Sequence, residues 1–212
     1  MIPLFKAFAA LLTYPSEEMR QALPEISVVI ASSPLVGAKE KQKLAELIAE
    51  LGEGDLLAAE ERYVDLFDRG RALSLNLFEH LHGEGRDRGA AMVDLKRLYD
   101  NAGFELVTRE LPDYLPVVLE YLSQSDVAEA RDMLADCAHI LTSIARSLIA
   151  RQSRYAAVLQ ALIVIAGEEP VDATGIKPVK PPAHELDHDW VEQPAFAGAP
   201  EVSTPATRAR PS

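Results

Sequence analysis

The chain has little of what small proteins use to stabilise themselves outside a hydrophobic core. Its 212 residues include a single cysteine, Cys137, so an internal disulfide framework is excluded and a reducing, cytoplasmic environment is expected. Only 6% of the residues are aromatic. No apolar run reaches the ~18 residues that a membrane-spanning helix requires. We therefore expect no direct membrane insertion.

Positive charge is also scarce. The sequence has 21 Lys and Arg against 33 Asp and Glu, giving a net charge of −12 and a pI near 4.9. A nucleic-acid-binding face needs cations to neutralise phosphates, and an anionic membrane attracts basic segments. The composition argues against both partners. It is compatible with a cationic or Arg-bearing one.

The sequence motifs of common enzyme chemistries are missing as well. There is no GxxxxGK[ST], no GxGxxG after a strand and no GxSxG. Phosphate-loop hydrolysis, Rossmann cofactor binding and hydrolase chemistry therefore lose their usual motifs. Asp113 and Glu120 could form an acid–base pair. However, two carboxylates seven positions apart on a helix more often pair with basic side chains in salt bridges. We predict that the protein is not an enzyme.

His80, His82, Glu79 and Glu84 are the residues that could suggest a metal site. Imidazole and carboxylate suit zinc or iron, but such a site needs three or four converging ligands. Helical side chains two positions apart point about 200° away from each other, so the two histidines would share a metal only after a break near Gly83. No HExxH motif supplies further ligands. We expect structural or partner-contact histidines; a metal-dependent enzyme using His80 and His82 is the alternative.

Helical patterning dominates the chain up to Gly167. The N-terminal segment Met1–Pro15 lacks a small-residue cleavage site, so we predict a first helix there rather than a signal peptide. A capping box at Asp126–Glu129 predicts a long helix, with Cys137 as an inert core residue on its apolar stripe. Ser27–Ile30 is the only short β candidate. The sequence predicts an all-α fold, a single helical bundle of about seven to nine helices.

The composition changes after Gly167. Residues 168–212 hold eight of the fourteen prolines and few large apolar side chains, so they cannot bury enough surface to offset their ordering entropy. We predict a helical domain over 1–167 and a disordered, acidic, Pro-rich tail over 168–212. The only tryptophan, Trp190, lies in this tail, near Phe196. It is either a stray aromatic or part of a segment that docks on the protein's own body or on a partner.

The most distinctive part of the sequence comprises two stretches of mixed polarity, Glu61–Gly89 and Glu110–Leu122. The first holds five arginines and no lysine, interleaved with acids and large apolar residues. Arg pairs with carboxylates through a rigid donor fork, whereas Lys acts as a flexible point charge. We call these two stretches the mixed block and expect fixed geometry there. Its arginines are Arg62, Arg69, Arg71, Arg86 and Arg88, and the acids among them are Asp65, Asp68, Glu79, Glu84 and Asp87.

Two interpretations of the mixed block remain open. One is a buried salt-bridge network that stabilises helix junctions. The other is a recognition groove with Leu77 among its apolar lining and charged groups on its rim, which suits an amphipathic helical peptide docked through its apolar face. The candidate peptide-binding residues are Leu66, Phe67, Arg69, Arg71, Phe78, Glu79, His80, His82, Arg86, Asp87, Arg88, Glu110, Pro112, Asp113, Tyr114, Leu115 and Leu119.

The mixed block resembles a known family. Its runs YVDLFDRGR and FEHLHGEGRDRG, followed by RELPDYLPVVLEYLS, are similar to the NarJ-type chaperones, also called the delta subunit of respiratory nitrate reductase. That family belongs to the wider group of all-helical molybdoenzyme maturation chaperones. The resemblance is strongest over residues 61–123, and the tail segment LDHDWVEQPAF resembles a Trp-containing element of the family.

The resemblance implies a dedicated assembly chaperone and not a catalyst. Such chaperones bind the N-terminal segment of the apo catalytic (alpha) subunit of nitrate reductase. They keep it competent to receive the bis-molybdopterin guanine dinucleotide cofactor and an iron–sulfur cluster, and hold no permanent cofactor themselves. Further implied partners are the alpha–beta complex and molybdenum cofactor biosynthesis proteins. The alternatives are a chaperone for a different molybdoenzyme and a permanent structural subunit of the reductase.

The second stretch departs from the pattern of the wider group at one position. There the motif reads Glu-x-Pro-Asp-His and helps to form the peptide site. Glu110, Pro112 and Asp113 match it, whereas Tyr114 stands where His is usual. A titratable imidazole is therefore not carried over, and we expect packing or hydroxyl hydrogen bonding from Tyr114. Gly85 stands where close relatives often have Ser.

Overall fold

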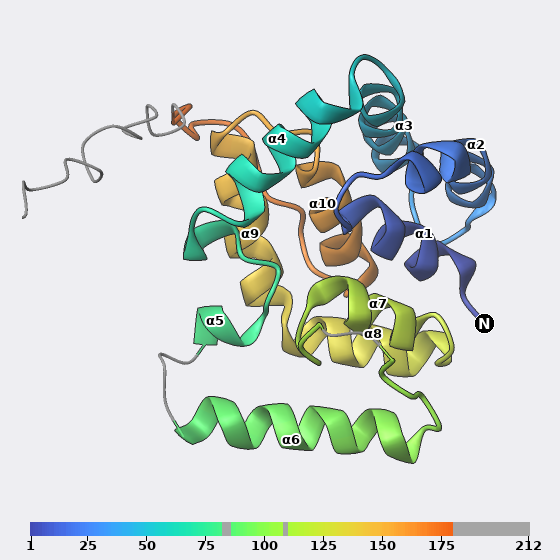
Figure 1. The fold of residues 1–212 in the computed structure, drawn as a ribbon, viewed down its shortest axis with the longest axis vertical. Coiled ribbons are helices and arrows are strands. Elements are labelled where there is room, and N and C mark those ends of the chain that lie inside the picture. Colours follow the sequence, from blue (N-terminus) through green and yellow to red (C-terminus); the bar gives the residue numbers. More distant parts are fainter. Residues whose placement is uncertain (82–85, 108–109, 180–212) are drawn as a thin grey trace, which may run out of the picture. The chain divides into compact units, whose positions relative to one another are not determined.

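The computed structural model describes residues 1–81, 86–107 and 110–179, and these residues are helical throughout their regular structure (Figure 1). The prediction of an all-α fold is confirmed, and the β candidate Ser27–Ile30 lies inside a helix. The elements within the described ranges are α1 (Pro3–Leu12), α2 (Glu17–Ser32), α3 (Ala38–Gly52), α4 (Leu56–Phe67), the 3₁₀ helix η1 (Arg71–Leu73), α5 (Phe78–Leu81), α6 (Arg86–Asn101), α7 (Leu115–Leu122), α8 (Val127–Asp136), α9 (Ala138–Ala150) and α10 (Ala156–Ile165).

Two helix starts are explained by their capping side chains. Ser16 Oγ accepts the N–H of Met19 at 3.2 Å, and Asp126 Oδ1 accepts the N–H of Glu129 at 2.9 Å. Each bond satisfies a backbone donor that has no partner within its helix, which is typically worth about 1 kcal/mol. Asp55 occupies the N-cap position of α4 but makes no capping bond.

The long helix predicted after Asp126 is in fact two helices, which is one reason why the described residues hold more helices than expected. The chain bends by 69° between α8 and α9, with Cys137 at the break. The Cys137 thiol donates to the carbonyl oxygens of Met133 and Leu134 at 3.4 Å each, close to the end of α8. Burial raises the pKa of this thiol to about 12, which agrees with the expected inert role.

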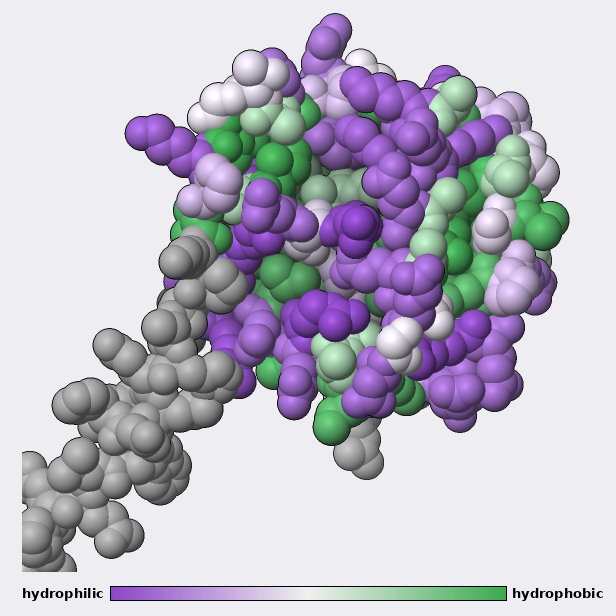
Figure 2. Space-filling view, turned by 90° about the horizontal axis from the view of Figure 1, so that it is seen from above, coloured by the Kyte–Doolittle hydropathy of each residue, from purple (hydrophilic) through white to green (hydrophobic). Residues whose placement is uncertain are grey.

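Within the described ranges, no single helix is both long and apolar enough to cross a lipid bilayer. α8 and α9 meet the criteria of length and composition only when they are taken together, across the 69° bend. The exterior seen in Figure 2 is mainly hydrophilic, with hydrophobic residues showing in patches between the charged ones.

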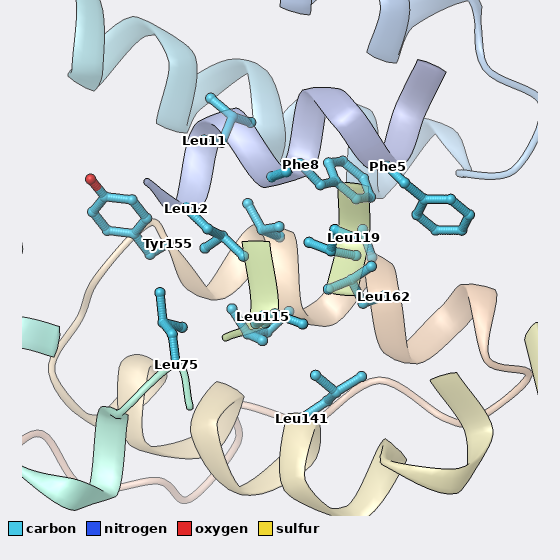
Figure 3. Packing of buried hydrophobic residues seen from close by; sticks show 14 of the residues in the cluster. Phe5, Phe8, Leu11, Leu12, Leu75, Leu115, Leu119, Leu141, Tyr155 and Leu162 are labelled. Carbon is cyan, nitrogen blue, oxygen red and sulfur yellow. The ribbon is translucent and has the colours of Figure 1, made fainter. Parts of the chain in front are cut away.

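The core is centred on α1, α7 and α10. α1 packs against α7, α2 and α10, and α10 also packs against α9, α3 and α8. Every residue of α10 except Val164 is buried, as is every residue of α7 except Glu120. Helices that are apolar on all sides belong at the centre of a bundle. Figure 3 shows Phe8 of α1, Leu119 of α7 and Leu162 of α10 converging there.

The chain beyond α10 packs back onto the helical body. The Gln160 side chain, in a residue only 4% exposed, donates to Val171 O at 2.9 Å and accepts the Val171 N–H at 2.8 Å. The N–H of Val179 donates to Ala150 O at 2.8 Å, at the end of α9. Residues 168–179, where the predicted tail starts, thus belong to the described unit. The remainder from residue 180, with the Trp190 segment, lies outside the described residues.

Truncation separates these two parts of the predicted tail. A chain ending at Val179 should unfold in urea at the same midpoint as the full chain. A chain ending at Gly167 should be less stable by about 1–3 kcal/mol, because a buried polar side chain that loses its partners carries a penalty of this size. Val171→Ala in the full chain is the control, since it keeps both backbone contacts to Gln160. Equal midpoints for the two truncations would contradict a stabilising role of residues 168–179.

Candidate functional site

The two stretches of the mixed block meet at a short backbone-paired contact. An isolated antiparallel bridge joins the segment between η1 and α5 to the segment that enters α7. The N–H of Leu77 donates to Asp113 O at 3.0 Å, and the N–H of Leu115 donates to Leu75 O at 2.8 Å. These bonds hold together two loops that lie far apart in the sequence, whereas the hydrogen bonds within a helix join only near neighbours. We call residues 74–80 together with 110–115 the junction.

Asp113 is the buried polar centre of the junction. It is 0% exposed; its Oδ2 accepts the N–H of Phe78 at 2.9 Å, and its Oδ1 has no hydrogen-bond partner among the described residues. Burial raises the pKa of the carboxyl, while the Phe78 N–H and the Arg88 guanidinium oppose the rise. Asp113 lies ahead of α7 and Glu120 is exposed on it. The two carboxylates therefore do not share a helix face as the sequence suggested.

A chain of tyrosine hydroxyls connects the junction to α4 and α1. The Tyr63 hydroxyl donates to Leu12 O at 2.8 Å and lies 3.1 Å from the Tyr114 hydroxyl. Because Tyr63 gives its only proton to a carbonyl, Tyr114 must be the donor between the two hydroxyls. Burial raises the pKa of both tyrosines, which keeps them protonated. The expected hydroxyl hydrogen bonding of Tyr114 is thus confirmed.

Two arginines of the mixed block converge on Glu79. Arg71 Nη2 donates to the Glu79 carbonyl oxygen at 2.8 Å, and Arg88 Nη2 lies 3.4 Å from Glu79 Oε1. One arginine therefore fixes the backbone of α5 and the other its side chain. The side chains of Arg86 and Asp87 lie outside the described residues.

The other two described arginine side chains of the mixed block, those of Arg62 and Arg69, form surface ion pairs. Arg69 Nη1 lies 3.0 Å from Asp65 Oδ1 one turn earlier in the chain, and Arg62 Nε lies 4.0 Å from Glu50 Oε1. Both arginine side chains are nearly half exposed. Exposed pairs of this kind contribute only about 0–1 kcal/mol. The fixed arginine geometry expected from the sequence is therefore found chiefly around Glu79.

His80 makes a local structural contact. Its Nε2 lies 2.8 Å from Ser74 O, and because a carbonyl oxygen only accepts, this nitrogen carries the proton. Within the described ranges, no group of three or more His, Cys, Asp or Glu side chains is placed to hold a metal ion. His82 and Glu84, the other candidate ligands, lie outside the described residues.

The structure places several predicted groove residues in the core. Leu115 and Leu119 are 0% exposed, and the Phe67 ring packs against Tyr63 and Tyr155 at centroid distances of 4.8 and 5.1 Å. α7 directs nearly all of its side chains inward, so its leucines cannot line a groove open in this structure. The buried members of the predicted lining are Phe67, Leu77, Leu115 and Leu119.

Other predicted residues lie where a partner could touch them. Phe78 and Tyr114 are partly exposed and pack against the edge of the core. Glu110, four residues before Tyr114 in the chain, is exposed. Leu111, which the sequence did not single out, is 44% exposed. Leu66 and Pro112 are also partly exposed. The accessible part of the junction is thus smaller than predicted and combines aromatic, apolar and acidic side chains.

α6 contacts the junction through both of its ends, which sequence reasoning did not anticipate. Arg88 near its start reaches Glu79, and the hydroxyl of Tyr99 near its end donates to Pro112 O at 2.8 Å. Tyr99 is 0% exposed, with its ring 4.9 Å from that of Tyr121. In the sequence, Met92, Leu95 and Tyr99 recur at helical spacing as an apolar stripe, and this stripe was the available signal. That stripe indicates burial but does not indicate against which element.

Comparison with known proteins assigns this helical protein to a family. The family model of the nitrate reductase delta subunit matches residues 35–160, from the loop before α3 into α10, and the match includes the junction. The chain therefore belongs to the nitrate reductase delta subunit family.

Individual relatives give the same result. The chain is 45% identical over 156 residues to the nitrate reductase molybdenum cofactor assembly chaperone NarJ of Escherichia coli strain K12, covering 74% of this chain and 66% of the relative. It is 37% identical over 164 residues to the probable chaperone NarW of that strain, covering 77% and 68%. Identity to the probable NarJ of Bacillus subtilis is 31% over 160 residues, covering 75% and 85%. The chain thus spans just under two thirds of the E. coli NarJ.

Burial of Asp113 predicts a pH-dependent stability. Because its pKa is raised in the folded state, the folded protein binds this proton more tightly than the unfolded chain does. Stability relative to Asp113→Asn should therefore fall as pH rises above about 3.9, the value of an unfolded Asp, and level off above the folded pKa. Urea unfolding of both proteins between pH 4 and 8 measures this. Asp132→Asn, exposed on α8, is the matched control. A stability difference independent of pH would contradict the assignment.

Proposed function

We propose that this protein is a cytoplasmic chaperone that assembles respiratory nitrate reductase by binding the N-terminal segment of its apo catalytic (alpha) subunit. The observation that carries the proposal is the 45% identity to a protein named as a nitrate reductase molybdenum cofactor assembly chaperone. The client, and not the chaperone, receives bis-molybdopterin guanine dinucleotide and an iron–sulfur cluster. Its further partners are the alpha–beta complex and molybdenum cofactor biosynthesis proteins.

We place the client contact on the accessible part of the junction. Phe78, Tyr114 and Leu111 supply apolar and aromatic surface there, and Glu79 and Glu110 supply negative charge. A helical peptide with one apolar and one basic face is complementary to such a surface. The net charge of −12 favours its approach.

The strength of the contact follows from its modest size. Burial of apolar surface contributes about 25 cal/mol per Å², but association also loses translational and side-chain freedom. The balance corresponds to a Kd between about micromolar and nanomolar. Such a complex can still dissociate, as a client that moves on to the assembled enzyme requires.

Substitutions on the surface and in the core should have different effects. Phe78→Ala should weaken binding of a synthetic peptide of the alpha-subunit N-terminus by about tenfold or more, since aromatic side chains dominate such contacts. Leu115→Ala should instead lower stability by about 2–5 kcal/mol, because it leaves a cavity in the core. Calorimetric titration and urea unfolding measure the two effects. Val28→Ala, at a 68% exposed site on α2, is the control. Unchanged affinity in folded Phe78→Ala would refute the placement.

Co-purification tests the role itself. The protein should be recovered with cofactor-free alpha subunit from cells that cannot make the molybdenum cofactor. It should be absent from the mature membrane-bound reductase. A stoichiometric presence in the mature enzyme would instead make it a permanent subunit, and recovery with another molybdoenzyme alone would change the client.

A further inference from the structure

α6 carries the chemistry that the junction is proposed to recognise. This helix of sixteen residues places Arg88, Met92, Leu95 and Tyr99 at successive spacings of four, three and four, which is one face of a helix. Arg88, Met92 and Leu95 are partly buried and Tyr99 is fully buried. Arg97, off this stripe, has a side chain that is 72% exposed. α6 is therefore an amphipathic helix with a cation at one end of its inward face and an aromatic ring at the other.

Both ends of this stripe contact the junction or its immediate neighbour α7. Arg88 pairs with Glu79, and its charge opposes the rise that burial causes in the pKa of Asp113. Tyr99 donates to Pro112 O and packs its ring against that of Tyr121 in α7. α6 thus contacts Glu79, one of the acidic groups that we assign to the client, and the backbone of Pro112 next to Leu111. Figure 1 shows α6 at the edge of the helical body.

The docking of α6 is shallow compared with that of the core helices. Of its described side chains Tyr99 alone is buried, and Val93 and Leu98 remain 50% and 41% exposed. The side chains of the Arg88–Glu79 pair are 22% and 25% exposed, so solvent still reaches this contact. Helices depend mainly on tertiary packing for their stability, so a segment with few buried side chains opens at low free energy.

We propose that α6 occupies the part of the client surface around Glu79 and Pro112 as an internal substitute, and that the client helix displaces it by presenting the same pattern of side chains. The pattern is an arginine followed by apolar residues four and seven positions later and an aromatic residue at eleven. The client arginine takes over the contact with Glu79. The aromatic residue replaces Tyr99 beside Tyr121. This inference rests on the proposed function and specifies the register of the partner.

Competition makes the two occupants thermodynamically linked. For a client that binds only when α6 has left, the apparent association constant is the intrinsic one multiplied by the fraction of molecules in which α6 is undocked. Any change that weakens α6 docking without altering Glu79 or Asp113 raises that affinity. If α6 were itself part of the surface that binds the client, the same substitutions would lower the affinity, because an α6 contact with the client would be lost.

The test compares Arg88→Ala and Tyr99→Phe with Arg97→Ala, a charge removal off the contacting stripe. Each is titrated in the full-length protein with the synthetic alpha-subunit N-terminal peptide. Arg88→Ala and Tyr99→Phe should bind about three- to tenfold more tightly than the unmodified protein, and Arg97→Ala should bind equally. Hydrogen exchange should show faster exchange in α6 and slower exchange at the junction when the peptide is added. Thermal melts establish that each variant is folded, and Tyr99→Phe keeps the buried ring.

The outcomes separate this inference from the proposed function. One outcome is that the unmodified protein binds the peptide, Arg88→Ala binds it more weakly, and α6 exchanges more slowly in the complex. This result would make α6 part of the binding surface, and it would overturn the displacement but not the proposed function. Equal affinity in all variants would overturn it as well. No binding by any folded variant would overturn the proposed client contact together with the displacement.

Discussion

The burial of one carboxylate at the meeting point of two loops is the constraint on which the mixed block depends. Asp113 can be buried because the N–H of Phe78 donates to it and because Arg88 lies close enough to act on its charge. These partners require α5 and α6 to lie at the entrance of α7. Charged and apolar residues are interleaved in this stretch because a single contact has to satisfy both a core edge and a polar centre.

Local patterning predicted much of the fold. The all-α class and the helix start at Asp126 follow from periodicity and capping alone. The break at Cys137 could not be predicted, because an apolar stripe continues through it, and α9 packs against α10 in a tertiary contact that local patterning does not reveal. For the same reason the composition after Gly167 did not reveal that Gln160 needs a partner from the following segment.

The sequence indicated the two stretches that meet at the junction, but not which of their side chains are exposed there. The motif containing Asp113 and the stretch containing Phe78 do meet, but Leu115 and Leu119 turn into the core. A helix that reads as one wall of a groove can equally be the centre of a bundle, and only tertiary contacts distinguish the two. The contact of α6 with the junction could not be predicted for a related reason. The position of Tyr99 indicates that its side chain is buried but does not identify the element that buries it.

The direction of the hydroxyl chain from Tyr114 through Tyr63 to Leu12 has one more consequence. A histidine at position 114 would gain or lose a proton near neutral pH and would then change between donor and acceptor in such a chain. A phenol whose pKa is raised by burial stays a donor throughout that range. Through Tyr63, the Tyr114 hydroxyl therefore joins the end of α1 to the junction in a way that does not change as the pH varies around neutrality.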